Sequence, residues 1–213
     1  MASSMIHIAI ANEINKKLKR DNKKLLIGTI APDISKLIGE TKVKSHFLIE
    51  KNSDIPNLQM FLNKYKEKLI DDFVMGYYIH LYTDYLWFKY FMPEVVDKDK
   101  LILTKIDGKK IKCAPAEIIQ YFYNDYTNLN TLLLDEYNLD LKIFYEELPK
   151  IENIIEEIPM DKINLIVDNA GIIVKNAVIK KDLVFDIENI KQFIKLSVNI
   201  ILGNLIELNL LNN

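Results

Sequence analysis

The sequence predicts an all-α protein, and two observations lead to that prediction. Apolar residues recur at three- and four-residue spacing through most of the chain, which is the period of an amphipathic helix. Prolines fall between or at the starts of the periodic segments, where a missing N–H costs least. These prolines are Pro56, Pro93, Pro115, Pro149 and Pro159. The predicted helices cover residues 4–19, 57–68, 70–92, 114–135, 139–147, 160–180 and 186–210.

The helical period is clearest in two parts of the chain. One is the run Phe61, Tyr65, Leu69 and Phe73, which recurs every four residues. The other is residues 186–210, which have three- and four-residue spacing with Ser197 as the one polar exception. This last segment has an apolar face that would suit a bilayer surface, but so wide a face is more typical of a core helix.

One segment departs from the helical pattern. Residues 101–113, LILTKIDGKKIKC, alternate apolar and polar side chains around the dipeptide Asp107-Gly108. Such a dipeptide suits a tight hairpin turn. The sequence therefore predicts one small β-hairpin within an otherwise helical chain.

The domain organisation follows from length and from the absence of linkers. The chain has 213 residues, and it shows no repeat, low-complexity segment or flexible linker. We expect a single helical domain over 1–213, in which residues 1–95 carry the chemistry and helices within 96–213 complete the fold.

Charge and cysteine content exclude several classes of protein. Lysine and arginine total 28 against 30 acidic residues, a net charge of −2, so no extended nucleic-acid-binding surface is indicated. Cys113 is the only cysteine, which excludes an internal disulfide and a thiolate-rich zinc site. The first twenty residues lack the order of a signal peptide, and no long uncharged apolar window is present. We expect a cytoplasmic protein without a transmembrane helix.

The stretch GYYIHLYTDYLWFKYF, residues 76–91, contains the first candidate site. His80 and Asp84 are four residues apart, so both lie on one helix face and can reach one ion. Alternatively, His80 is a core histidine bonded to a backbone carbonyl, and Asp84 is a surface or capping group. Aromatic neighbours on nearly every face indicate deep burial, and a buried carboxylate needs a cation or several donors.

Three further residues extend this candidate site. Asp33 follows Ala31-Pro32, where an isolated aspartate would more often cap a short helix beginning at Ile34. His46 precedes Phe47, and His7 lies between Ile6 and Ile8, so all three histidines of the chain have apolar neighbours. Imidazoles with carboxylates and no thiolate are the ligands that zinc, manganese or iron takes in a hydrolytic site.

In these segments the sequence resembles the zinc-dependent phospholipase C family, an all-α fold shared with zinc-dependent single-strand nucleases. The resemblance covers roughly the first 95 residues and runs in order through His7, GTIAPDI, SHF and GYYIHLYTDYLW. It implies that Asp33, His46, His80 and Asp84 hold one ion. It also implies that His7 and the shared Asp84 carboxylate hold a second one.

Two features of that family are not matched. Secreted members use the mature N-terminal amino group as a ligand, whereas the residues before His7 show no cleavage site. Three-metal members also have histidines and a glutamate after the ligand helix, and this chain has no histidine beyond His80. The third site is therefore either lost or rebuilt from carboxylates, with Asp125 and Glu117 as candidates, although Asp125 could equally cap a turn.

The resemblance implies a metal-dependent phosphoesterase of phospholipase C type, which hydrolyses a phosphodiester with a metal-activated water. The expected cofactor is one or two Zn²⁺ ions, with Mn²⁺ or iron as alternatives. Asp33 would bind an ion and orient the attacking water. The expected substrate carries a phospholipid head group or a nucleotide, and the sequence does not indicate an oligomeric state. Tyr77 and Trp87 share the His80 face and could line a pocket, although core packing is the more usual role.

Two other functions fit parts of the pattern. A non-catalytic helical domain with a structural or vestigial metal site is favoured by the missing third site. A phosphohydrolase built on an adjacent histidine-aspartate dipeptide ranks last, because no histidine in this chain is followed by aspartate.

Overall fold

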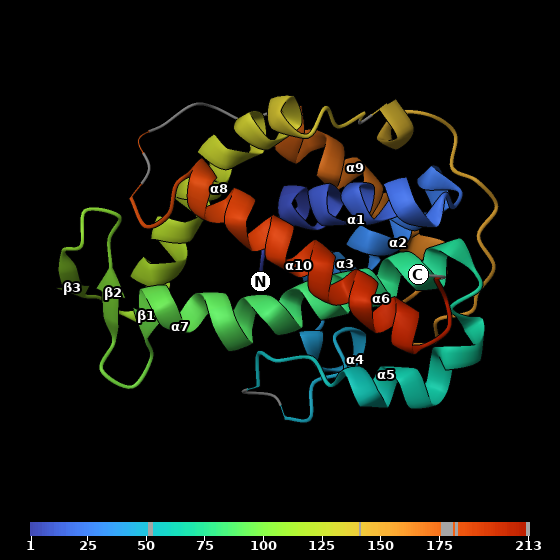
Figure 1. Cartoon of the computed structure of the whole chain (residues 1–213), viewed down its shortest axis with the longest axis horizontal. Helices are drawn as coiled ribbons and strands as arrows, with labels where there is room; N and C mark the ends of the chain where they lie inside the picture. Colours follow the sequence, from blue (N-terminus) through green and yellow to red (C-terminus); the bar gives the residue numbers. More distant parts are fainter. Residues whose placement is uncertain (51–52, 141, 176–180, 182, 212–213) are drawn as a thin grey trace.

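The fold is built around one central helix. The computed structural model describes residues 1–50, 53–140, 142–175, 181 and 183–211 and confirms the all-α prediction. The central helix is α6 (Asp72–Leu86), which begins where the Asp71 side chain accepts hydrogen bonds from two backbone N–H groups. It contacts α1, α2, α5 and α10. The bounds of these neighbours are Ser4–Leu18, Asn22–Ile30, Leu58–Tyr65 and Ile187–Glu207. Figure 1 shows α10 crossing α6, and α10 also contacts α1.

Helix α2, which the sequence analysis did not predict, packs very closely against α6. A Cβ atom at Gly28 would lie 2.1 Å from the Phe73 carbonyl oxygen, and one at Gly76 would lie 1.9 Å from the Leu25 carbonyl oxygen. Only glycine permits this approach of two backbones. The contact places the end of α2, which leads into Asp33, beside the helix that carries His80 and Asp84.

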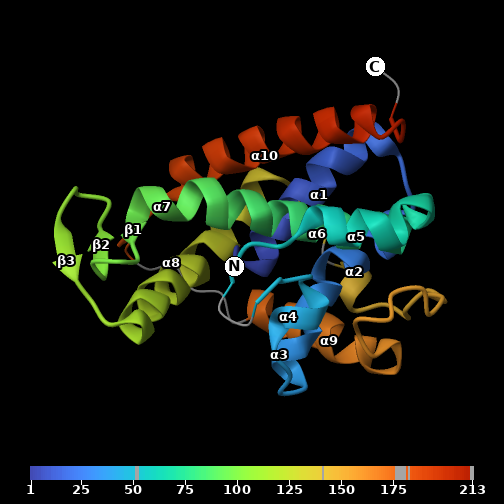
Figure 2. The ribbon, with the colours of Figure 1, turned by 90° about the horizontal axis from the view of Figure 1, so that it is seen from below.

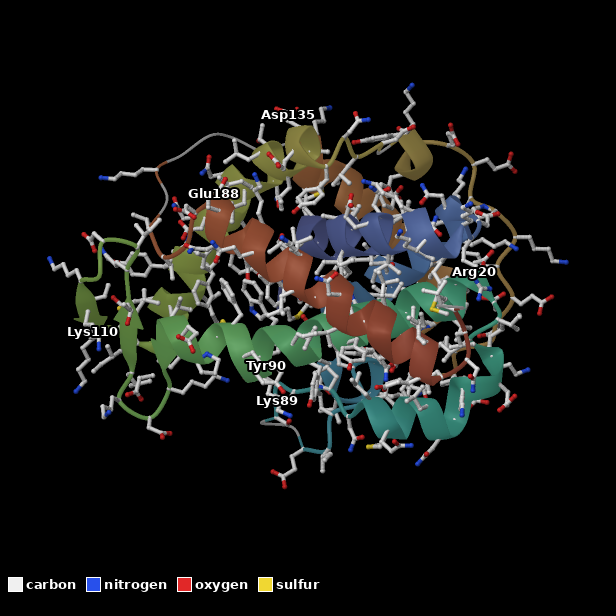
Figure 3. All side chains as sticks on the ribbon, viewed as in Figure 1. Arg20, Lys89, Tyr90, Lys110, Asp135 and Glu188 are labelled. Atoms are coloured by element: carbon white, nitrogen blue, oxygen red, sulfur yellow. The ribbon has the colours of Figure 1, made fainter. Side chains whose placement is uncertain are left out.

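Hydrogen bonds at the surface connect the loops that precede α2 and α6. Asp21 caps α2, because its side chain accepts hydrogen bonds from the N–H groups of Lys23 and Lys24. Arg20, labelled in Figure 3, donates from Nη1 to the Ile70 carbonyl oxygen over 2.6 Å. This bond joins the loop before α2 to the loop before α6.

The segment predicted as one helix over 70–92 consists of two α-helices joined by a π-helical stretch. α6 continues through a π-helical stretch, Trp87–Phe91, into α7 (Met92–Val95). Pro93 lies in the first turn of α7 and has no N–H to donate to the preceding turn. The π-helical stretch exposes Lys89 and Tyr90, whose side chains point away from the core (Figure 3).

The predicted hairpin is present and gains a third strand. β2 (Ile102–Thr104) and β3 (Lys110–Lys112) pair antiparallel, with Leu103 opposite Ile111, and β1 (Val96–Asp97) pairs with β2. Gly108 adopts a φ of +80° and donates its N–H to the Lys105 carbonyl. The glycine therefore occupies the left-handed position of a three-residue loop.

Four further helices pack against α1, α2 and the 3₁₀ turn Ala31–Asp33 that follows α2. These are α3 (Ile34–Leu37), α4 (Lys42–Ser45), α8 (Pro115–Glu136) and α9 (Ile163–Lys175). α9 contacts α3 and α2, and α8 contacts α1, as Figure 2 shows from below. α10 buries its apolar stripe against α1, which agrees with a core helix.

The helix predicted at 139–147 is wrong. The structure has only the 3₁₀ turn Lys142–Phe144 there, while residue 141 lies outside the described residues. So short a segment has little helical stability of its own, and tertiary contacts decide its conformation. Tyr145 donates its hydroxyl to the Gly171 carbonyl of α9. The predicted continuation of α9 over 176–180 falls outside the described residues.

No helix among the described residues combines the length and apolar character needed to cross a bilayer.

Candidate metal centre

All five residues predicted as metal ligands converge in the interior. His7 comes from α1, Asp33 from the 3₁₀ turn after α2, His46 from the end of α4, and His80 and Asp84 from α6. Each is at most 5% exposed. Two groups have ligand atoms close enough to share an ion: His7, His80 and Asp84, and Asp33, His46 and His80.

The separations between these ligand atoms match those expected around a tetrahedral ion. His46 Nε2 lies 3.2 Å from His80 Nε2, 3.4 Å from Asp33 Oδ1 and 3.7 Å from Asp84 Oδ2. His7 Nε2 lies 3.3 Å from Asp84 Oδ1. Ligand atoms about 2.0–2.1 Å from a tetrahedral zinc ion lie roughly 3.3 Å from one another. The side chains are therefore spaced to hold an ion between them.

Several of these atoms have no hydrogen-bond partner among the described residues. They are Asp33 Oδ1, Asp84 Oδ2 and both ring nitrogens of His7. The His7 to Asp84 contact is within ion-pair distance, but its geometry is not that of a hydrogen bond. Buried polar atoms without partners are costly, and a bound cation would satisfy the lone pairs of these groups.

Neighbouring groups orient two of the histidine rings. His80 Nδ1 lies 2.7 Å from the Thr29 carbonyl oxygen. Because a carbonyl only accepts, Nδ1 carries the proton and Nε2 presents its lone pair to the cluster. His46 Nδ1 lies 2.9 Å from Ser45 Oγ, and Tyr77 donates its hydroxyl to the Ser45 carbonyl. Tyr77 is thus a buried residue that supports the site from outside it.

The protonation states suit metal binding at neutral pH. Burial and the neighbouring His7 hold the pKa of His80 well below its usual 6.5, so the ring is neutral. Burial alone would raise the pKa of Asp84, but interactions with His7 and His80 hold it well below its usual 3.8. Burial likewise opposes ionisation of Asp33, whereas Lys36 and His46 hold its pKa well below the usual range. Both carboxylates are therefore ionised.

The structure separates two interpretations of Asp33. α3 does begin at Ile34, but the Asp33 side chain makes no capping hydrogen bond. Its Oδ1 instead faces His46 Nε2 and Lys36 Nζ, at 3.4 Å and 3.7 Å. The carboxylate therefore belongs to the cluster and is not a helix cap.

The first residues of the chain also lie against the cluster. The Ala2 N–H donates to Asp84 Oδ1 over 3.2 Å, and the Tyr126 hydroxyl donates to the Met1 carbonyl. Burial lowers the pKa of the Met1 amino group to about 5. The hydrogen bond from the Ala2 N–H orients the Asp84 carboxylate, and no feature of the sequence indicated this bond.

A cavity of about 960 Å³ opens beside Asp33. Its wall contains Lys36 and Lys42, and much of the remaining lining consists of apolar side chains of α8 and α9, such as Phe122 and Ile166. Tyr77 and Trp87 are fully buried and do not line the cavity. Trp87 packs in the core, and Tyr77 supports the cluster through the Ser45 carbonyl. Lys36, Lys42 and the cavity wall were not singled out in the sequence, because lysines and apolar positions carry no distinctive pattern.

The two candidates for a third metal site have structural partners. Asp125 is buried and accepts hydrogen bonds from the backbone N–H groups of Leu183, Val184 and Phe185. Glu117 accepts from the Ala114 N–H at the start of α8 and is exposed. Neither belongs to a group of described residues that could hold a metal.

Asp125→Ala is expected to destabilise the protein without reducing its metal content. The substitution leaves three backbone donors without their acceptor, which should lower the free energy of unfolding by about 3 kcal/mol. Urea unfolding and elemental analysis of the same preparation test both parts. A folded variant that had lost metal would place Asp125 in the metal centre instead.

The metal-free protein should lose stability as the pH falls below about 6.5. The unfolded His80 takes up a proton there, whereas the folded His80, with its lowered pKa, does not. The slope from this one group is at most about 1.4 kcal/mol per pH unit. His80→Gln should have a shallower slope in urea unfolding at pH 7.5, 6.5 and 5.5. The Met1 amino group contributes in the same direction but is present in both proteins. Equal slopes would contradict the assignment.

No protein-family model, curated protein or solved structure shows a significant match to this chain, so the functional argument rests on the geometry of this cluster and its cavity.

Proposed function

We propose that the protein is a metal-dependent phosphoesterase of phospholipase C type, which hydrolyses a phosphodiester with a metal-activated water. The observation that carries the proposal is the convergence of three buried histidines and two buried carboxylates at ligand spacing, beside an open cavity. The donor set contains only imidazole and carboxylate, which suits zinc in a hydrolytic site.

The proposed ligands fall into two sets that share Asp84. Asp33, His46, His80 and Asp84 would hold one ion, and His7 with the other oxygen of Asp84 would help to hold a second. The contacts of Asp84 Oδ2 with His46 and His80, and of Oδ1 with His7, fit this division. When bound, such ions supply an acidified water and neutralise charge on a phosphoryl group.

The chain's own residues account for orientation and access. Asp33 is the only one of the five proposed ligands that lines the cavity, so it lies where the substrate and the attacking water would meet. Its lowered pKa makes it a weak base, which suits orienting a water better than taking its proton. The buried rings of His7 and His80, stacked 3.9 Å apart, exclude water behind the cluster.

The cavity favours a substrate with an apolar part over a nucleotide. Its walls on α7, α8 and α9 present many aliphatic side chains, including Met92, Ile118 and Ile173. A lipid-like diester would bury its chains against this wall while its phosphate reached the Asp33 end. A cytoplasmic location remains part of the proposal.

Metal content and turnover test this proposal together. Protein purified without chelators or a metal-affinity tag should contain one or two zinc equivalents, and His80→Ala should contain fewer. The zinc-loaded protein should hydrolyse short-chain phosphodiesters, and chelator-treated protein should not. The proposal would be contradicted if the wild-type protein contained no metal and a folded His80→Ala variant had the same metal content.

The alternative is a non-catalytic helical domain with a structural metal. The full burial of four of the five ligand side chains off the cavity wall favours it, because structural sites are closed to solvent. The two functions differ in one measurable property. Both functions predict that the protein binds zinc and is stabilised by it. Only the phosphoesterase would hydrolyse a phosphodiester.

A further inference from the structure

Two lysines lie next to the candidate metal centre, and the neighbouring carboxylates do not neutralise both of them. Lys36 and Lys42 both line the cavity that Asp33 also lines, and Lys36 Nζ lies 3.7 Å from Asp33 Oδ1. Lys36 lies one helical turn after Asp33, and Lys42 lies one turn before His46. Lys36 and Lys42 belong to the short helices α3 and α4, which directly follow Asp33 and directly precede His46, and these two helices lie side by side in Figure 2.

The charges that line the cavity do not cancel once a metal is bound. Asp54 pairs with Lys98 over 2.6 Å at the cavity wall. Asp33 faces Lys36 at 3.7 Å, but as a metal ligand its charge would be shared with the ion. Lys42 forms no ion pair with a described carboxylate, and its Nζ lies 5.9 Å over the Phe88 ring. One divalent ion balances Asp33 and Asp84, so the two lysine charges remain, and the second proposed ion would add further positive charge.

One phosphodiester group neutralises only one of these charges. Lys42 is half-buried, and burial lowers its pKa, so the cation is partly desolvated and would gain from an anionic partner. Ammonium groups bind phosphate and carboxylate oxygens through charge-assisted hydrogen bonds.

We infer that Lys36 and Lys42 form an anion subsite that selects a substrate with a second negative group beside its phosphodiester. This inference rests on the proposed function and extends it, because it specifies the polar head of the substrate as anionic. The lysines are specificity residues and take no part in the reaction itself. The apolar wall of the cavity would hold the remainder of an amphiphilic ester.

A matched pair of soluble lipids tests the inference. Dihexanoyl phosphatidylinositol and dihexanoyl phosphatidylinositol 4-phosphate share one diester and differ by one phosphate group. Calorimetry on zinc-loaded protein with the non-hydrolysable phosphonate analogues of the two lipids measures the Kd of each without turnover, and kinetics on the same protein with the lipids themselves measure KM. We expect the wild-type protein to prefer the phosphorylated lipid about tenfold in both measurements.

Three lysine variants identify the source of the preference. Lys42→Gln and Lys36→Gln should each weaken binding of the phosphorylated lipid severalfold and leave the Kd of the other lipid nearly unchanged. Lys44→Gln is the matched control, because Lys44 lies on the same short helix but is exposed and does not line the cavity. It should retain the full preference.

The outcomes separate this inference from the proposed function. Turnover of both lipids with equal Kd values would overturn the anion subsite and leave the phosphoesterase in place. A lysine-dependent preference in Kd without any turnover would support the subsite and contradict the enzyme. Failure to bind either lipid, or a preference that survives both lysine substitutions, would overturn the subsite.

Discussion

Asp84→Asn should reduce zinc affinity by at least about a hundredfold, more than loss of a supporting residue around a metal usually costs. The Asp84 carboxylate contacts three histidines: Oδ1 faces His7, and Oδ2 faces His46 and His80. Asparagine keeps the shape and one acceptor oxygen for the Ala2 N–H. It removes the charge and one ligand atom. Competition with a chromophoric zinc chelator measures the change.

The control for this substitution is Asp125→Asn, which alters another fully buried aspartate away from the cluster. It should bind zinc as the wild-type protein does. Zinc at a thousandfold excess over its Kd should stabilise the wild-type protein by about 4 kcal/mol, and that stabilisation should disappear in Asp84→Asn. Unchanged zinc affinity in Asp84→Asn would exclude the cluster as the metal centre.

Gly76→Ala should destabilise the protein by about 3 kcal/mol or more. The added Cβ would lie 1.9 Å from the Leu25 carbonyl oxygen and 2.9 Å from the Thr29 amide nitrogen, both backbone atoms of α2. Backbone cannot rotate away, so α2 and α6 must separate. That movement would also pull the Thr29 carbonyl from His80 Nδ1. Urea unfolding gives the loss of stability, and zinc titration should show weaker binding.

The matched control is Gly203→Ala within α10. A Cβ there meets no heavy atom within 4 Å, so only helix propensity changes. Alanine should stabilise this position by up to about 1 kcal/mol. A Gly76→Ala variant that lost less than about 1 kcal/mol would show that the two helices do not need their close approach.

The ligand positions could be predicted because they depend on the spacing of nearby residues and on the chemistry of single side chains. His80 and Asp84 depend only on helical spacing, and the aromatic residues around them indicate burial directly. Asp33 and His46 were harder, because one loop aspartate or one histidine has several ordinary roles. The structure separated those roles for Asp33, whose carboxylate faces His46 and makes no cap.

Helix α2 was missed for a physical reason. Its apolar run, LLIGTI, is short, contains a glycine, and is buried on every side, so it lacks the polar face that reveals a helix. Conversely, the helix predicted at 139–147 has a plausible pattern but too few residues to be stable alone. In both segments the packing of neighbours outweighed local preference.

The sequence alone determines the helical class, the hairpin around Gly108 and the types of ligand. Periodicity, turn chemistry and side-chain donors are all properties of short segments. The convergence of the ligands, the anchoring of His80 on Thr29, and the lysines beside the cavity depend on contacts between residues far apart in the chain. The contact of His80 with Thr29 depends directly on the close approach of α2 and α6 at Gly28 and Gly76, because the shapes of both helices together set how near their backbones lie.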